Sequence, residues 1–199
     1  MIVSFYGFAK VVVGGIYRPL FRIRAIGREN VPKEGGVLLC SNHLHYFDPI
    51  LLGLTLDRRI RFMAKKELFS VPLLGKIITV LGAFPVKRGM SDRQAIRTGL
   101  KILKEGHVMG IFPEGTRSKT GKLGKPLAGA GFFALKTDAA VVPAAIIGNY
   151  RPFKRMTVVY GKPIDMGALR ARKASAEEVA ELIMQEIKKL IDEHQSQNS

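Results

Sequence analysis

The 199-residue chain has one cysteine, no tryptophan and only 16 acidic side chains. Cys40 has no partner for an internal disulfide, which fits a reducing compartment such as the cytoplasm. No secretory signal is evident, because the first nine residues carry no basic side chain and no A-x-A cleavage pattern follows. We therefore expect a cytoplasmic protein whose N-terminus is retained.

Acidic residues are outnumbered by 32 Lys and Arg residues, which gives a formal net charge of +16 at pH 7. Such a surface attracts anions, and phosphate is the first ligand to consider. The cations are interleaved with apolar strands instead of being concentrated in one helix or arm, and no nucleic-acid motif is present. The pattern therefore argues against a nucleic-acid partner and leaves open a non-catalytic protein that binds anionic lipid.

No apolar run is long enough for a clear membrane span, which needs about 20 apolar residues. The segment 1–21 is apolar on nearly every side of a helix. It is interrupted by Lys10, the Gly14–Gly15 pair, Arg18 and Pro19. We expect residues 1–27 to form a helical, membrane-associating segment that lies in one leaflet. The alternatives are a core helix of a soluble domain and a true span.

Beyond this segment, short β-rich runs alternate with helix-like stretches, which is typical of one α/β domain with crossover helices. The expected strands are 36–40, 60–64, 82–86, 107–112, 140–147 and 156–161. Capping boxes at Ser91 and at Ser175 predict two helices, the first of which ends at Gly106. We expect a mixed, largely parallel sheet flanked by helices over residues 28–191, followed by a polar tail over 192–199.

The segment from Cys40 to Pro49 contains residues suited to catalysis and lies where a buried strand is expected to pass into a helix. The Asp48-Pro49 pair is a helix-start signature, and the preceding turn brings His43 within reach of the carboxylate. A His-Asp pair of this kind supports general-base catalysis, whereas the plainer interpretation is a structural histidine and a capping aspartate. A zinc site with Cys40 and His45 lacks a second ligand cluster, so no metal is expected.

Two further segments end expected strands with cations. In the segment 110–118, Arg117 is placed to bind phosphate, and Glu114 to hold that arginine or a substrate hydroxyl. A surface turn with an ordinary exposed ion pair is the other interpretation. In the segment 84–89, Lys87 and Arg88 suit an anionic head group, although a solvated basic turn is the plainer interpretation. No G-x-S-x-G nucleophile elbow of serine hydrolases occurs. Five residues instead of four separate Gly115 from Gly121-Lys122, so the segment does not match the P-loop of nucleotide hydrolases.

Four segments together resemble the glycerolipid acyltransferase family and follow one another in that family's order. They are the N-H-x4-D segment at 42–48, FPVKRG at 84–89, FPEGTRS at 112–118 and VVPAAI at 141–146. The resemblance covers about residues 28–165, and the apolar N-terminus is similar to the membrane anchor of bacterial members that acylate lysophosphatidate. It implies an acyltransferase domain over residues 28–191.

The resemblance also implies roles for individual residues. His43 is the base that deprotonates the acceptor hydroxyl, and Asp48 orients its imidazole. The substrate-binding set is Lys87, Arg88, Glu114, Gly115, Thr116 and Arg117, with Asn42 and Pro143 in support. Pro143 centres a strand expected to line the acyl or thioester side. The apolar stretch Leu68–Leu81 has two interpretations, an acyl groove or membrane-facing helix and a buried crossover helix.

The implied reaction transfers a fatty acyl group to the 2-hydroxyl of 1-acylglycerol-3-phosphate, which gives phosphatidate for phospholipid synthesis. The acyl donor is an acyl-CoA or acyl carrier protein thioester, and no cofactor or metal is needed. The expected partners are these substrates and an anionic membrane surface on the cytoplasmic face. Glycerol-3-phosphate or another lysophospholipid is the alternative acceptor.

Overall fold

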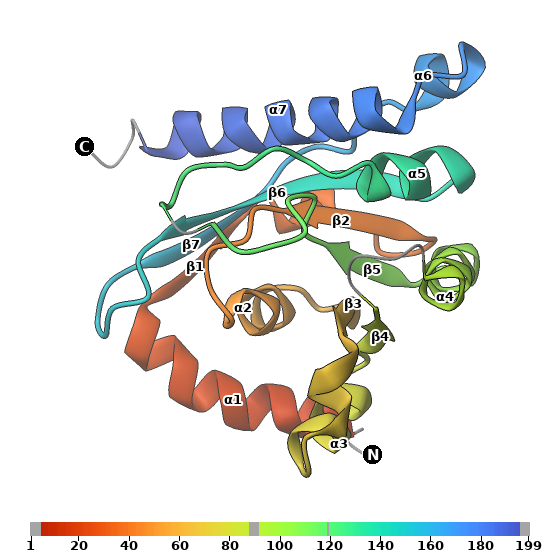
Figure 1. Ribbon diagram of the computed structural model, residues 1–199. Coiled ribbons are helices and arrows are strands. Elements are labelled where there is room, and N and C mark those ends of the chain that lie inside the picture. Colours follow the sequence, from red (N-terminus) through yellow and green to blue (C-terminus); the bar gives the residue numbers. More distant parts are fainter. Residues whose placement is uncertain (1–4, 88–91, 119, 196–199) are drawn as a thin grey trace.

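The computed structural model describes residues 5–87, 92–118 and 120–195, and these fold around one seven-stranded sheet (Figure 1). The strand order is β1-β7-β6-β2-β5-β3-β4. The strands are β1 (Ile23–Ile26), β2 (Val37–Ser41), β3 (Ile60–Lys65), β4 (Phe84–Val86), β5 (Val108–Ile111), β6 (Ala140–Gly148) and β7 (Met156–Tyr160). All neighbours pair in parallel except β6 and β7, so the expected mixed, largely parallel sheet is confirmed.

Helices cover both faces of the sheet (Figure 1). The upper layer in this view contains α5 (Gly129–Lys136), the short α6 (Gly167–Ala171) and the long α7 (Ala176–Gln195), with α4 (Arg93–Lys104) at the sheet's edge. Below the sheet lie α2 (Asp48–Thr55), then α1 (Phe5–Phe21) and α3 (Leu74–Val80) at the lower end of the molecule. Two 3-10 turns, η1 (Arg28–Asn30) and η2 (Lys66–Ser70), complete the elements.

The central strand β2 is buried along its whole length because both of its faces meet helices. Successive side chains of a strand point to opposite faces, so Leu38 and Cys40 join the core under α5 and α7. Val37 and Leu39 join the core that includes Leu51 and Leu52 of α2. The same alternation decides which functional side chains can meet at the end of the sheet.

One of the two predicted helix starts matches the sequence pattern, and the other differs by one residue. Ser175 accepts a hydrogen bond from the backbone N–H of Glu178 at 3.1 Å, as expected for the capping box that opens α7. For α4 the capping residue is Asp92, whose carboxylate accepts from the N–H groups of Gln94 and Ala95. Ser91, the expected cap, lies outside the described residues. Helix α7 continues to Gln195, into the stretch expected to be a polar tail.

The sequence analysis missed one strand. Residues 23–26 were assigned to the apolar N-terminal segment, but they form β1 and pair with β7 at the edge of the sheet. The run is only four residues long and follows the apolar N-terminal stretch almost directly, so no separate strand was recognised there. The α/β domain therefore begins before residue 28.

The apolar stretch at 68–81 is not a buried crossover helix. Within the helix α3, only Gly75 is buried. Large apolar side chains of this stretch are exposed, namely Leu68, Val71, Leu73, Leu74, Ile77 and Val80. Across the described parts of the chain, no helix has both the length and the apolar character to cross a bilayer.

Helices α5 and α7 touch through a glycine, which gives a stability test. A Cβ on Gly131 would lie 1.9 Å from the carbonyl oxygen of Ala176, whereas a Cβ on Gly129 would meet nothing within 4 Å. We expect Gly131→Ala to lower the free energy of unfolding by about 1–3 kcal/mol through overpacking. Gly129→Ala, on the same helix, should be neutral or slightly stabilising. Denaturant unfolding of both variants measures the difference, and equal stabilities would contradict this packing.

Candidate active site

The candidate site lies at the end of the sheet formed by the carboxyl ends of three neighbouring central strands. The strands β6, β2 and β5 run parallel and lie side by side. The residues that follow them are Tyr150 after β6, Asn42 and His43 after β2, and Phe112 after β5. Ligand sites of open α/β sheets are built at this edge.

Asn42 continues the pairing of β2 with β6 through its side chain. Its amide donates to the carbonyl of Ile146 at 3.0 Å, and its side-chain oxygen accepts from the N–H of Ile146 at 2.7 Å. The side chain is buried, so these two bonds satisfy both of its polar ends. Asn42 thereby fixes the point at which the chain leaves the sheet, one residue before His43.

His43 and Asp48 form the expected pair. The distance from His43 Nδ1 to Asp48 Oδ2 is 2.7 Å. The same oxygen accepts the backbone N–H groups of Leu44 and His45 at 2.6 and 2.7 Å. Asp48 is fully buried and is the first residue of α2, and its carboxylate turns back to bind the preceding loop instead of capping the helix.

The imidazole of His43 is held by stacking as well as by this bond. Its ring lies 3.9 Å from that of Phe112 with an angle of 11° between the planes, and Phe112 stacks in turn on Phe62. The side chain is 13% exposed. Among the described residues, none forms a hydrogen bond with Nε2, so this nitrogen is available to a hydroxyl group.

Glu114 holds loops together and does not contact Arg117, contrary to one sequence interpretation. Its carboxylate accepts the N–H of His43 at 3.0 Å and the N–H of Gly124 at 2.8 Å. It is 7% exposed, so both oxygens are used inside the protein. Glu114 therefore joins the loop after β5 to the loop that carries His43.

Gly115 makes the turn that follows Glu114. Its φ of +64° is unfavourable for other residues, and a Cβ there would lie 2.4 Å from Leu127 Cδ1. Thr116, the next residue, is exposed. The loop then returns to the site, where the N–H of Ser118 donates to the carbonyl of His43 at 2.8 Å.

Arg117 packs against the His43–Asp48 loop. Its Cζ is 3.5 Å from the centre of the Tyr46 ring, and its Nη2 donates to the Tyr46 hydroxyl at 2.7 Å. The stacking is a cation–π contact that leaves other guanidinium donors for a ligand. Tyr46 was not predicted as part of the site, although an exposed aromatic residue inside the motif was a signal.

The structure does not bring Lys87 to the His43–Asp48 pair. Lys87 is exposed and follows β4, three strands away from β2 at the same sheet edge. At about 4.8 Å per strand, it stands about 14 Å from the end of β2. Arg88 lies outside the described residues.

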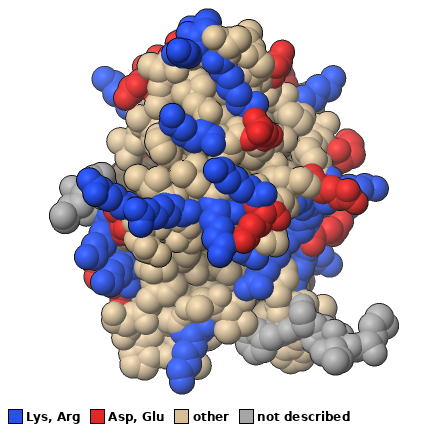
Figure 2. Space-filling view, turned by 90° about the vertical axis from the view of Figure 1, so that its right-hand side faces the viewer, with Lys and Arg blue, Asp and Glu red and all other residues tan. Residues whose placement is uncertain are grey.

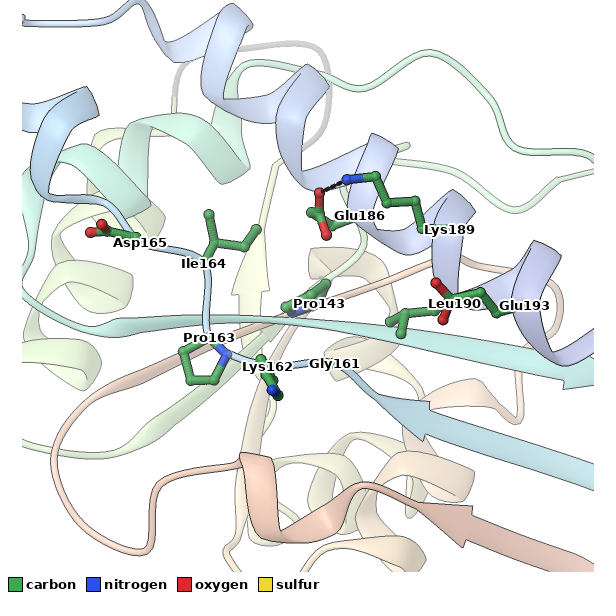
Figure 3. Close-up of a pocket in the computed structure, with 10 residues that line it drawn as sticks. All are labelled: Pro143, Gly161, Lys162, Pro163, Ile164, Asp165, Glu186, Lys189, Leu190 and Glu193. Atoms are coloured by element: carbon green, nitrogen blue, oxygen red, sulfur yellow. Dashed lines mark hydrogen bonds and ion pairs between the residues drawn. The ribbon is translucent and has the colours of Figure 1, made fainter.

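Pro143 lies on the other face of the sheet. It pairs with Cys40 in the β2–β6 ladder and has the same orientation as Val141, which belongs to the core under α7. Figure 3 shows it between β6 and α7, where it lines a pocket of about 410 Å³. Strand alternation directs Pro143 away from the face that carries the His43 ring, so its supporting role on the acyl or thioester side stays a prediction.

Tyr150 is a site residue that the sequence analysis missed. Its hydroxyl donates to Asp48 Oδ1 at 2.7 Å, across 102 residues of sequence. Burial, followed by the negative charge of Asp48, raises the pKa of Tyr150, so the phenol remains a donor. The available signal was its position, two residues beyond β6 at the edge where the other site residues lie.

Cys40 takes no part in this arrangement. It is fully buried, and burial raises the pKa of its thiol, which opposes formation of a thiolate. In the part of the chain that the structure describes, no three His, Cys, Asp or Glu side chains gather closely enough to hold a metal ion.

The largely parallel sheet carries a His-Asp pair and an arginine at the carboxyl ends of its strands. These features define a class of α/β protein, and comparison with known families identifies it. The Acyltransferase family model matches residues 22–147. The match covers more than half of the chain and contains both the His43–Asp48 loop and the Arg117 loop. The chain belongs to this acyltransferase family.

Individual relatives agree with the family match. The chain is 35% identical over 178 residues to the 1-acyl-sn-glycerol-3-phosphate acyltransferase of Bacillus subtilis, which covers 84% of this chain and 87% of that protein. It is also 35% identical over 134 residues to the chloroplastic LPAT1 of Arabidopsis thaliana, covering 66% of this chain and 37% of that protein. The crystal structure of the acyltransferase PlsC from Thermotoga maritima superposes with a TM-score of 0.72 at 26% identity, covering 87% and 72%.

Proposed function

We propose that this protein transfers a fatty acyl group from an acyl thioester to the 2-hydroxyl of 1-acylglycerol-3-phosphate, which yields phosphatidate. The observation that carries the proposal is the His43–Asp48 pair, whose Nε2 faces no protein partner among the described residues. Relatives at 35% identity are named for this reaction. The two substrates required are a lysophosphatidate acceptor and an activated acyl donor.

The proposed chemistry moves one proton twice. His43 Nε2 removes the proton from the acceptor hydroxyl as its oxygen attacks the thioester carbonyl, and the imidazolium forms against Asp48. The tetrahedral intermediate then expels the thiolate, which takes the proton from Nε2. An ester and a free thiol result, and His43 returns to its starting state.

Direct attack by the acceptor needs no covalent acyl-enzyme. The nearest residues with nucleophilic side chains in the sequence are Cys40 and Ser41, and both are fully buried. The Ser41 hydroxyl donates to the backbone carbonyl of Asn42 at 3.2 Å. General-base catalysis contributes about 10²- to 10⁴-fold, so orientation of both substrates must supply the remaining acceleration.

Arg117 is the proposed contact for the acceptor phosphate. Its planar guanidinium suits a phosphate, and its position on Tyr46 places it beside the loop that carries His43. Lys87, which follows β4 at the same end of the sheet, is assigned to longer-range attraction of anionic substrates, and Arg88, the next residue in the sequence, is proposed to add to its charge. The donor is proposed to be acyl-CoA or acyl carrier protein, both of which are acidic.

We also propose that the lower end of the molecule rests in one membrane leaflet. Exposed apolar side chains of α1 are Phe8, Val11, Val12 and Ile16. Helix α1 and helix α3 both lie at the lower end of the molecule (Figure 1), and α3 with the adjoining η2 also exposes apolar side chains. The 17 residues of α1 extend about 25 Å, less than the roughly 30 Å of a bilayer core. This geometry favours an interfacial helix. We assign the helix to the cytoplasmic face as part of the same proposal.

The charges of this end support the membrane proposal. Lys10, which interrupts the apolar run, donates to the carbonyl of Leu56 at the end of α2. Partial burial lowers the pKa of Lys10, consistent with a side chain directed toward the protein. Figure 2 shows a lower end with few charged side chains, and above it a region in which Lys and Arg side chains predominate over Asp and Glu, which suits anionic lipid head groups.

The role of His43 predicts the effect of its removal. His43→Ala should lower kcat by at least about 10²-fold, with folding and vesicle binding retained, because the base is lost. His107→Ala is the matched control, since His107 precedes β5 at the opposite edge of the sheet. Product analysis with lysophosphatidate and each thioester gives the measurement. Near-normal turnover by His43→Ala would refute the mechanism.

The role of Arg117 predicts a defect in acceptor binding. Arg117→Ala should raise the KM for lysophosphatidate about tenfold to a hundredfold, because charge-assisted hydrogen bonds to the phosphate are lost. Arg97→Ala removes the same charge from the exposed face of α4 and serves as the control. Unchanged kcat and KM in Arg117→Ala would remove this assignment.

The membrane proposal is tested by vesicle flotation. Replacing Val11 and Ile16 together by aspartate should weaken binding to vesicles of anionic lipid, because two exposed apolar side chains become charged. Gln185→Asp adds a like charge on α7, on the other side of the sheet, and should have little effect. Equal flotation of the double variant and the wild type would contradict the proposed surface.

A further inference from the structure

The buried carboxylate of Asp48 is bonded through both of its oxygens, and the two oxygens have different partners. Oδ2 faces His43 Nδ1 and two backbone N–H groups of the same loop. Oδ1 is bonded by the hydroxyl of Tyr150 at 2.7 Å. Among the described residues, Tyr150 is therefore the one side chain from outside the His43–Asp48 loop that fixes this carboxylate.

We propose that Tyr150 is a positioning residue of the active site, which acts on His43 through Asp48. The proposal rests on the acyl transfer proposed above. An aspartate side chain turns readily about its last torsion, and its two oxygens are chemically equivalent. A donor on Oδ1 removes this equivalence and keeps Oδ2 directed at Nδ1, which in turn keeps the proton on Nδ1 and leaves Nε2 as the base.

The chemistry of the hydroxyl suits this role. Burial and the charge of Asp48 both raise the pKa of Tyr150, so the phenol stays protonated and donates to the carboxylate. Hydrogen bonds from a hydroxyl to an ionised carboxylate are among the stronger ones in proteins. In addition, a second satisfied oxygen offsets part of the cost of burying the charge.

The packing fixes the ring of Tyr150 independently of its hydroxyl. The ring centre lies 4.8 Å from that of His45, 5.6 Å from that of Phe21 and 5.9 Å from that of Phe47. The following residues are tied to α1, since the N–H of Phe153 donates to the carbonyl of Leu20 at 2.6 Å. A phenylalanine at position 150 should therefore keep the ring in place and remove only the hydrogen bond.

The experiment compares Tyr150→Phe with Tyr160→Phe. Tyr160 is fully buried, and its hydroxyl forms a 2.7 Å hydrogen bond with Thr55, which lies at the opposite end of α2 from Asp48. This control therefore also removes one buried tyrosine hydroxyl. We expect Tyr150→Phe to lower kcat about tenfold to a hundredfold, the effect of losing a hydrogen bond to a charged group. The KM for lysophosphatidate should stay within about twofold, because Arg117 is untouched. Tyr160→Phe should keep wild-type kcat.

Two measurements separate positioning from a general loss of structure. Nitrogen-15 NMR of the His43 ring should show the Nδ1–H form in the wild type and a mixture of the two neutral forms in Tyr150→Phe. In an Asp48→Asn background, the same substitution should cause no further loss of kcat, because its effect passes through the carboxylate. Thermal unfolding of both variants monitors folding.

Each outcome bears on one proposal. If the wild type fails to acylate lysophosphatidate, the proposed function fails. If the wild type is active and Tyr150→Phe keeps its kcat, the positioning role is overturned. It is equally overturned if kcat falls while the ring NMR is unchanged, or if the loss of kcat persists in the Asp48→Asn background.

Discussion

The burial of the Asp48 charge is the constraint on which the site depends. A carboxylate removed from water is unfavourable unless hydrogen bonds replace its hydration. Asp48 is fully buried and obtains those bonds from the backbone of its own loop, from His43 and from Tyr150. The stability of the folded chain therefore requires the arrangement that the proposed chemistry uses, because moving any donor leaves a buried charge less satisfied.

A second buried carboxylate extends this arrangement to the next loop. Glu114 accepts the N–H of His43 and the N–H of Gly124, so the loop after β5 is fixed to the loop after β2. Arg117 follows three residues later and rests on Tyr46. Because β6, β2 and β5 are adjacent and parallel, three loops distant in sequence meet at one edge. The carboxylates of Asp48 and Glu114 then fix these loops to one another.

The sequence predicted those parts of the site whose partners are close in the chain. The pairing of His43 with Asp48 follows from a spacing of five residues and a helix start. Tyr150 was missed because its bond to Asp48 spans the sheet, and local patterns carry no information about such a contact. The face of the sheet on which Pro143 lies was also beyond the sequence, since it depends on the register of β6 with β2. Glu114 was predicted as a site residue that holds Arg117 or a substrate hydroxyl. Its backbone partners at His43 and Gly124 cannot be read from the sequence.

Helix α1 serves the site and the proposed membrane surface with different faces. Its inner face meets the site through the contacts of Tyr17 with Phe47 and of Phe21 with Tyr150. Its outer residues, among them Val11 and Ile16, remain exposed and apolar. The helix whose outer face is proposed to contact lipid thus packs, through Phe21, on the Tyr150 ring whose hydroxyl donates to Asp48. In the proposed membrane placement, the same packing joins the surface that faces the lipid to the loop that carries the reacting imidazole, because Tyr17 and Phe21 of α1 contact Phe47 and Tyr150.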